Sequence, residues 1–303
     1  MALAITFAFL AAFGFGTANV LIRIATQHVS APTATFFGVL TGAFLIVGLA
    51  FGLNLPEIRG LSTVALGWFA LMGLMAYPMA RVLHASAISM VGASRAAPIG
   101  AFQPVFALTL GILLLGEQPN LLISVGTPVV VAGIILVVLA GSRSGSVQRV
   151  GQGVGSLRSL GYLLALAAAA MFASRDVISR HVVSGIAPPM VTAGFALAIG
   201  AFMLFLVLHR QVVEDLRSLP RRHLGICAVL GLVQGLAVAS LFQALSRAPV
   251  TVVSPIYASM PLFTLALSHL FLRRLEVINQ PLVIGTTVSV VGVAMVVIGA
   301  ARA

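Results

Sequence analysis

Charged side chains are scarce in this sequence, and lysine is missing altogether. Only 8% of the 303 residues are Asp, Glu, Lys or Arg, and all 17 Lys-or-Arg positions are arginine. A soluble globular domain has about 25% charged residues, so a chain of this composition could not cover its surface in water. With 60% hydrophobic residues and a mean hydropathy of +1.14, the chain is predicted to lie in a lipid bilayer.

Other absences exclude whole classes of function. The single cysteine, Cys227, excludes an intrachain disulfide framework and a cysteine-ligated metal site, and its apolar surroundings predict a small core residue. The net charge of +11 does not indicate nucleic acid, because the arginines lie in short gaps between apolar runs and not on one basic face. The sequence has no phosphate-binding loop, HExxH motif or nucleophile elbow, so we expect no enzymatic activity, cofactor or metal.

Ten apolar runs are long enough to cross a bilayer, which takes about 20 residues at a rise of about 1.5 Å each. The predicted spans are residues 3–26, 33–53, 63–84, 96–115, 121–140, 160–183, 189–209, 224–246, 250–272 and 281–300. The first is predicted to be a span and not a signal peptide, because no arginine precedes it. A polar loop is expected at 210–222. The fold class is therefore an all-α membrane protein with ten transmembrane helices.

The chain contains one unit twice. Pro98 and Pro104 stand six residues apart at the head of one apolar run, and Pro255 and Pro261 repeat the pattern 157 residues later. Further positions match at nearly the same offset: the pairs are Asn19 and Asp176, Arg23 and Arg180, Tyr77 and Gln234, Glu117 and Glu276, Gly126 and Gly285, and Gly133 and Gly292.

Five spans per unit make the second unit enter the membrane from the opposite side. The halves are therefore predicted to be inverted repeats, residues 1–141 and 159–303, joined by a Gly-, Ser- and Arg-rich linker at 142–158. This is the plan of secondary transporters, in which the substrate site lies near the membrane midplane between the repeats.

The repeated Pro-x5-Pro pattern, the Leu115-Gly116-Glu117 ending and the paired five-span units resemble the EamA-type members of the drug/metabolite transporter superfamily. The resemblance covers nearly the whole chain. It implies a basket of ten helices, with spans 1, 3, 4, 6, 8 and 9 around a cavity, and a small-metabolite substrate such as an amino acid. Many relatives have Trp-Gly where this chain has Phe15-Gly16. Spans 1 and 6 lack the embedded glutamate of the superfamily's multidrug exporters, which argues against that activity.

Polar side chains at membrane depth mark the interior of a helix bundle or a wet cavity. The residues expected to bind substrate are Asn19, Tyr77, Arg81, His84, Gln103, Arg175, Asp176, Gln234 and Tyr257. The spacing of Tyr77, Arg81 and His84 places them on one helical face. The structural alternative is that such groups satisfy carbonyls freed beside prolines, or join neighbouring helices by hydrogen bonds.

Asp176 is the only acidic residue well inside a predicted span. An ion pair with Arg180, one turn further on, is expected. Two interpretations stay open: a structural pair that makes insertion tolerable, or a binding charge for a zwitterion or a coupling proton. Glu117 and Glu276 are expected at the rims of their spans, where each holds the turn into the next helix. His269 is predicted to be a core histidine.

The four repeated prolines are predicted hinges. A proline removes a backbone hydrogen bond and bends its helix. Pro98, Pro104, Pro255 and Pro261 would then let spans 4 and 9 bend, so that one side of the membrane opens while the other closes.

These observations favour an exporter of small metabolites, amino acids above all, that works by alternating access in a bacterial inner membrane. Its expected partners are a small-molecule substrate and the lipid bilayer, without nucleic acid. Two alternatives remain: an organic-anion or sugar-phosphate exchanger that uses Arg81, Arg175 and Arg247, and a non-transporting membrane scaffold. The arginine-rich loops would place both termini outside the cytoplasm, whereas the resemblance implies termini inside. The orientation, the coupling ion and the oligomeric state stay open.

Overall fold

The computed structural model describes residues 1–91, 93–144, 155–218, 221–271 and 280–302, most of which are helical, with no β-strand among them. The helices are α1 (Ala2–Ala25), α2 (Ala31–Leu53), α3 (Leu55–Arg59), α4 (Thr63–Leu74), α5 (Ala80–Val91), α6 (Ala93–Gly100), α7 (Gln103–Leu115), α8 (Leu121–Ser144), α9 (Gly155–Gly185), α10 (Pro189–Ser218), α11 (Arg221–Leu245), α12 (Val250–Tyr257), α13 (Met260–Phe271) and α14 (Gln280–Arg302). Within these residues, ten helical stretches are long and apolar enough to cross a membrane, which confirms the predicted fold class.

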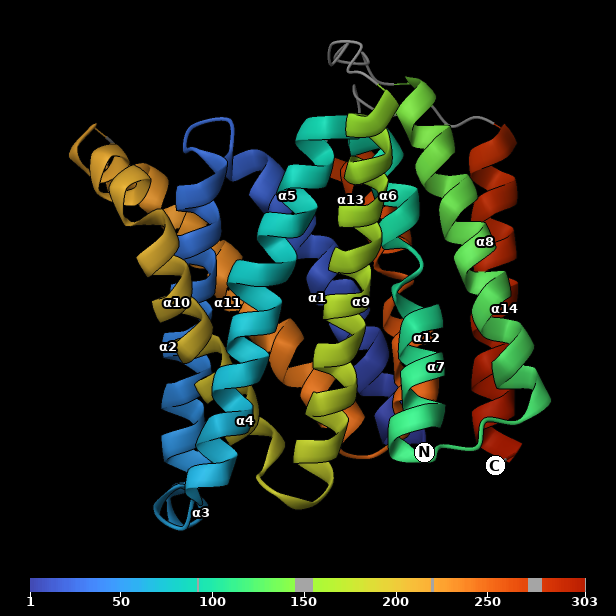
Figure 1. The fold of residues 1–303 in the computed structure, drawn as a ribbon, viewed down its shortest axis with the longest axis horizontal. Helices are drawn as coiled ribbons and strands as arrows, with labels where there is room; N and C mark the ends of the chain where they lie inside the picture. Colours follow the sequence, from blue (N-terminus) through green and yellow to red (C-terminus); the bar gives the residue numbers. More distant parts are fainter. Residues whose placement is uncertain (92, 145–154, 219–220, 272–279, 303) are drawn as a thin grey trace.

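The two chain ends lie on the same side of the bundle, at the bottom of Figure 1. Helix α8 ends and α9 begins on the opposite side, so each half crosses the bundle five times and the second half is inverted (Figure 1). We call the two faces the terminus side and the linker side. Helix α8 ends at Ser144 and helix α9 begins at Gly155, so both ends of the predicted linker 142–158 are helical. Residues 145–154 of the linker lie outside the described part of the chain.

The loop predicted at 210–222 is wrong, because α10 continues as a helix to Ser218. Asp215 explains why α10 stays helical beyond the end of its apolar span. Its carboxylate accepts hydrogen bonds from the hydroxyls of Ser30 and Thr33, the latter at 2.5 Å, and Ser30 also caps the start of α2. The end of α10 is therefore anchored to the beginning of α2 on the linker side.

Spans 4 and 9 are each interrupted at the same place in the repeat. Span 4 divides into α6 and α7 at residues 101–102, and span 9 divides into α12 and α13 at residues 258–259. The backbone bonds repeat as well: Phe102 N–H donates to Ile99 and Ser259 N–H donates to Ile256, each at 3.1 Å. These are three-residue turns, tighter than an α-helix.

The prolines explain the interruptions. Pro98 and Pro255 lie inside the short helices before each break. Pro104 and Pro261 lie in the first turn after it, where a missing N–H costs nothing. The helices are thus broken and not merely bent at these sites; whether they act as hinges remains a prediction. Glu276, expected at the end of span 9, lies outside the described residues.

The two repeats are interleaved, because most helix–helix contacts join a helix of one repeat to a helix of the other. Helix α1 packs on α11, α2 on α10 and α11, α5 on α9, and α8 on α14. Helices α8 and α14 lie side by side at the right edge of Figure 1, while α2 and α10 form the left edge. The main buried core therefore lies largely between the two halves. Cys227 is buried, as predicted, in a smaller apolar cluster with Ala25, Val29 and Ala34.

Glycines allow the closest of these contacts. In the α8–α14 pair, a methyl group on Gly126 would lie 3.0 Å from the Gly292 carbonyl, and one on Gly285 would lie 3.0 Å from the Gly133 carbonyl. These are the residues that the repeat aligns, so the local two-fold axis passes between α8 and α14. A similar approach joins α2 to α11, where a methyl group on Gly42 would lie 2.8 Å from the carbonyl oxygen of Gly231.

The α2–α11 contact gives a stability test with a matched control. Gly42→Leu should lower the midpoint of thermal unfolding in detergent by several degrees, because overpacking costs about 1–3 kcal/mol. Gly48 lies on the same helix, and a methyl group added there would have nothing within 4 Å, so Gly48→Leu should leave the midpoint nearly unchanged. Equal effects of the two substitutions would contradict the close crossing.

Candidate functional site

The carboxylate of Asp176, in the second half of α9, is fully buried and joins both helix breaks. The Tyr257 hydroxyl donates to Asp176 Oδ2 at 2.5 Å, and Gln103 Nε2 donates to the same oxygen at 2.9 Å. The Gln103 amide also donates to the Tyr257 hydroxyl. Gln103 is the first residue of α7 and Tyr257 is the last of α12, so spans 4, 6 and 9 meet at one oxygen atom. These three residues form what we call the polar centre.

Arg175 supplies the compensating charge. Its Nη2 lies 2.9 Å from Asp176 Oδ1, and the arginine side chain is only 11% exposed. Adjacent residues do not face each other on a helix, so the guanidinium must curl round to reach its neighbour. Asp176 Oδ1 and Arg175 Nε are buried without a well-aligned hydrogen bond. Both charges of the pair therefore keep unused hydrogen-bonding capacity.

The predicted pairing of Asp176 with Arg180 is wrong. Arg180 Nη1 instead donates to the Leu245 carbonyl at 2.6 Å. Leu245 is the last residue of α11, and the final carbonyls of a helix lack intrahelical donors and attract cations. Arg180 therefore belongs to the contacts of α11 with α9 and not to the polar centre.

Tyr77 lies in a widened stretch of span 3. Residues Met75–Met79 form a π-helical turn, and Pro78 inside it cannot donate the usual backbone hydrogen bond. Such turns often occur at functional sites. The phenol ring packs against Gly200 of α10, where any side chain larger than glycine would collide with it.

Arg81 and His84 continue along the face of span 3 towards the linker side. The Arg81 guanidinium lies 5.5 Å from the centre of the Tyr77 ring, and its Nε is buried without a hydrogen-bond partner. Tyr77, Arg81 and Arg175 lie within electrostatic reach of one another. His84 is half-buried beside Gly100 of α6. This face thus approaches the polar centre through Arg175.

Two predicted site residues have their described contacts elsewhere. Asn19 of α1 is exposed, and its Nδ2 donates to Thr264 Oγ1 of α13 at 3.3 Å. The side-chain oxygen of Gln234 lies beside Gly38 of α2. Both contacts join helices of different repeats. A role for Asn19 and Gln234 in substrate binding stays a prediction.

Phe15 is a neighbour of the polar centre that the site prediction left out. Its ring centre lies 6.2 Å from that of Tyr257. The adjacent Gly16 allows α1 to approach α13 closely, because a methyl group there would lie 3.0 Å from the Met260 carbonyl. The available signal was the Phe15-Gly16 pair itself, at the position where relatives carry Trp-Gly.

Arg247 and His269 are both exposed. Arg247 is exposed at the end of α11, where it donates to the Gln243 carbonyl at 2.8 Å and lies over the Phe7 ring at 5.1 Å. His269 is exposed in a groove of about 310 Å³ between α13 and α14, so the prediction of a core histidine is wrong. Neither residue contacts the polar centre in the described contacts.

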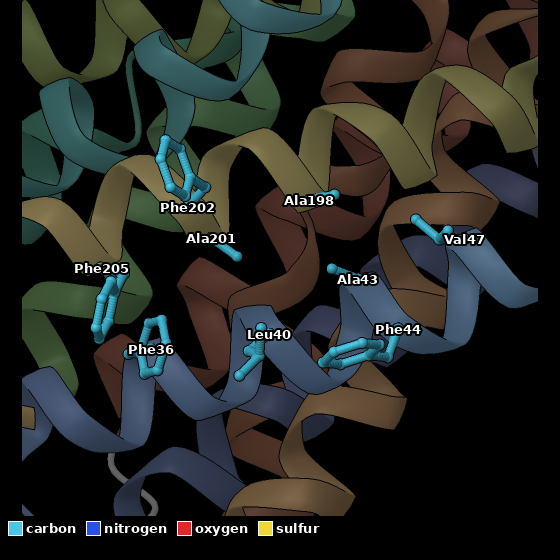
Figure 2. Close-up of a pocket in the computed structure, with 9 residues that line it drawn as sticks. All are labelled: Phe36, Leu40, Ala43, Phe44, Val47, Ala198, Ala201, Phe202 and Phe205. Carbon is cyan, nitrogen blue, oxygen red and sulfur yellow. The ribbon is translucent and has the colours of Figure 1, made fainter.

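An apolar groove of about 420 Å³ lies between α2 and α10, at one edge of the bundle. Figure 2 shows its lining, which consists of Phe36, Leu40, Ala43, Phe44, Val47, Ala198, Ala201, Phe202 and Phe205. None of these side chains offers a hydrogen bond. In a bilayer such a groove suits hydrocarbon chains, so a polar substrate site is better sought at the polar centre.

The fold and its centre define a class of protein. In the described residues, ten apolar helical stretches form two inverted five-span repeats, and buried charges meet where two discontinuous helices come together. This is the arrangement of secondary transporters. Among the residues that the structure describes, no three His, Cys, Asp or Glu side chains form a group suited to a metal ion.

Comparison with known proteins identifies the family. The EamA-like transporter family matches residues 2–139 and 159–298, once in each repeat, and the chain belongs to this family. A solved structure described only as "Crystal structure of protein" is similar over 99% of this chain and 98% of its own, with a TM-score of 0.77 and 20% identity, which shows the shared fold. Among curated proteins none matches. The chain is thus a multi-pass membrane protein of a family of small-molecule transporters and not of enzymes.

The buried ion pair can be tested by a double substitution. Arg175→Met should lower the thermal midpoint markedly, because a carboxylate left buried without its cation costs about 3–5 kcal/mol. Adding Asp176→Asn removes the uncompensated charge, so the double variant should be more stable than Arg175→Met alone. The exposed Arg247→Met serves as the control and should change little. A double variant as unstable as the single one would contradict the pairing.

Proposed function

We propose that the protein exports amino acids or related small zwitterions across a bacterial inner membrane by alternating access. One observation carries the proposal: a buried acid and a buried base, each with unused hydrogen-bonding capacity, lie where the two broken helices meet. A zwitterion has complementary charges at a matching short separation. The moving parts are spans 4 and 9, one in each of the halves 1–141 and 159–303.

In this proposal the substrate inserts itself into the existing ion pair. The ammonium group of the substrate donates to Asp176 Oδ1, the oxygen that lacks an aligned donor, while Oδ2 stays hydrogen-bonded to Gln103 and Tyr257. The carboxylate of the substrate accepts hydrogen bonds from the Arg175 guanidinium, whose Nε has no other partner. Desolvation of both charges is then compensated within the site, which favours zwitterions over singly charged solutes. Tyr77 and Phe15 would contact the substrate side chain.

The same contacts give a reason for coupling binding to helix movement. Gln103 and Tyr257 lie at the two helix breaks, and both hold one carboxylate. A ligand that shifts this carboxylate changes the support of both breaks at once. We therefore assign substrate contacts to Gln103, Arg175, Asp176 and Tyr257, and hinge motion to the four prolines.

Counterflow into proteoliposomes tests the substrate class. Purified protein loaded with one unlabelled amino acid should accumulate the same labelled amino acid, for at least one member of a broad panel. Inorganic phosphate should not inhibit this exchange. No counterflow and no thermal stabilisation by any amino acid would contradict the proposal.

A charge substitution then tests the site. Asp176→Asn should weaken zwitterion affinity about ten- to a hundredfold, because a charged hydrogen bond to the ammonium is replaced by a neutral one. Glu57→Gln in the exposed helix α3 is the matched control and should leave affinity unchanged. The measurement is a binding titration by thermal shift. Equal affinities of the two variants would remove Asp176 from the site.

An anion substrate is the second candidate, and one observation favours it. Arg81 and Arg175 act on each other electrostatically while Asp176 is the acid beside them, so this region has more positive than negative charge. Arg247, the third arginine of that hypothesis, lies apart at the end of α11. Phosphate or a phosphorylated sugar that competes in the exchange assay would support this candidate over the zwitterion.

The hinge assignment predicts a kinetic effect. Pro104→Ala and Pro261→Ala should slow transport several-fold and leave substrate affinity nearly unchanged, because they stiffen the breaks without touching the charges. Pro128→Ala, in the outer helix α8, is the control and should leave the rate as it is. Normal transport rates together with weakened substrate binding in Pro104→Ala and Pro261→Ala would contradict this assignment.

A further inference from the structure

Glu117 lies at the end of span 4 but caps a helix of the other repeat. Its Oε1 accepts the Val250 backbone N–H at 2.8 Å, and its Oε2 accepts that of Thr251 at 2.9 Å. Gly116 ends α7 with a left-handed backbone (φ 65°) and turns the chain so that the Glu117 N–H returns to the Gly111 carbonyl. Glu117 thus lies at the rim of its span, as expected, but its carboxylate caps α12 of the other repeat, and the expectation that it holds the turn into the next helix is wrong.

The connection between α11 and α12 is held at both ends by opposite charges. Pro249 precedes α12 and offers no side-chain cap, so Glu117 supplies the negative charge that the start of a helix favours. Arg180 supplies the positive charge at the end of α11, on the Leu245 carbonyl. Glu117 follows the end of α7 and Arg180 lies in α9, so both reach this connection from elsewhere in the chain, on the terminus side of the bundle.

The two repeats differ where the repeat aligns α6 with α12. Every residue of α12, from Val250 to Tyr257, is buried. Among the aligned residues of α6 whose burial is described, Ala96 is also buried, but residues 97–100 are all partly exposed. Ser254, which is 0% exposed, aligns with Ala97, which is half-buried. The structure is therefore packed more tightly around α12 on the terminus side than around α6 on the linker side.

We propose that Glu117 is the latch that keeps the terminus side closed. Its carboxylate joins the end of α7 to the start of α12, and opening that side must pull these two ends apart. The latch rests on the alternating-access function proposed above, but it involves neither the Asp176–Arg175 ion pair nor a particular substrate. Loss of the latch should shift the population towards a state that is open on the terminus side and more closed on the linker side.

Two repeat-related cysteine probes test the latch without any substrate. In a Cys227→Ala background, Ser254→Cys reports the terminus side and Ala97→Cys reports the linker side. Each is labelled with a small charged thiol reagent in detergent, where both faces are reachable. Glu117→Gln should speed labelling at position 254 about tenfold, because the cap loses its charge and one acceptor. It should slow labelling at position 97.

Controls separate a latch from a merely structural contact. Glu57→Gln, an exposed glutamate of α3, should change neither rate. Glu117→Asp keeps the charge but has a side chain one methylene shorter, so we expect the labelling rate at position 254 to rise about threefold. If Glu117→Gln does not fold, this variant serves as the test. Faster labelling at both positions would mean general loosening and would overturn the proposal, as would unchanged labelling. Amino-acid binding by the same variants reports separately on the substrate proposal.

Discussion

The buried carboxylate of Asp176 is the constraint on which the centre of this protein depends. An isolated charge in a membrane interior costs at least several kcal/mol, so the fold must supply partners for it. It does so from three spans: a guanidinium from α9, an amide from the break in span 4 and a phenol from the break in span 9. The same hydrogen bonds give the side chains of Gln103 and Tyr257 a partner inside the bundle. The carboxylate and these two side chains therefore stabilise one another.

The inverted repeat gives this centre a symmetric frame but not symmetric contents. The breaks at 101–102 and 258–259 have the same backbone hydrogen bonds, and the glycines of α8 and α14 cross about a local two-fold axis. The charges of Arg175 and Asp176, the Gln103 amide and the Tyr257 phenol are not duplicated. At the positions aligned with Arg175, Asp176, Gln103 and Tyr257, the other repeat has Ala18, Asn19, Met260 and Gly100. One framework thus holds a single polar centre, and the burial of α12 and α6 differs accordingly.

Sequence patterns predicted the spans, the helix breaks and the inverted repeat well, because these features depend on residues that are close together in the sequence or repeated at a fixed offset. Apolar length set the ten spans, proline positions marked the two breaks, and the repeat implied the inversion. Gln103, Asp176 and Tyr257 were also foreseen, since polar groups at membrane depth are costly. Their mutual contacts were not, because they join residues 73 and 81 positions apart. Nor could helical spacing tell that Arg175 and not Arg180 would pair with Asp176, or that Glu117 would cap a helix of the other repeat. Those outcomes depend on which helices meet.

Infrared difference spectroscopy tests most directly whether substrate engages the Asp176 carboxylate. Spectra would be recorded on the purified protein before and after addition of a saturating amino acid that it transports. The proposed site predicts a shift of a protein carboxylate band that disappears in Asp176→Asn, because the ammonium group binds Asp176 Oδ1. A carboxylate band that does not respond, or a response that persists in Asp176→Asn, would contradict the proposed site.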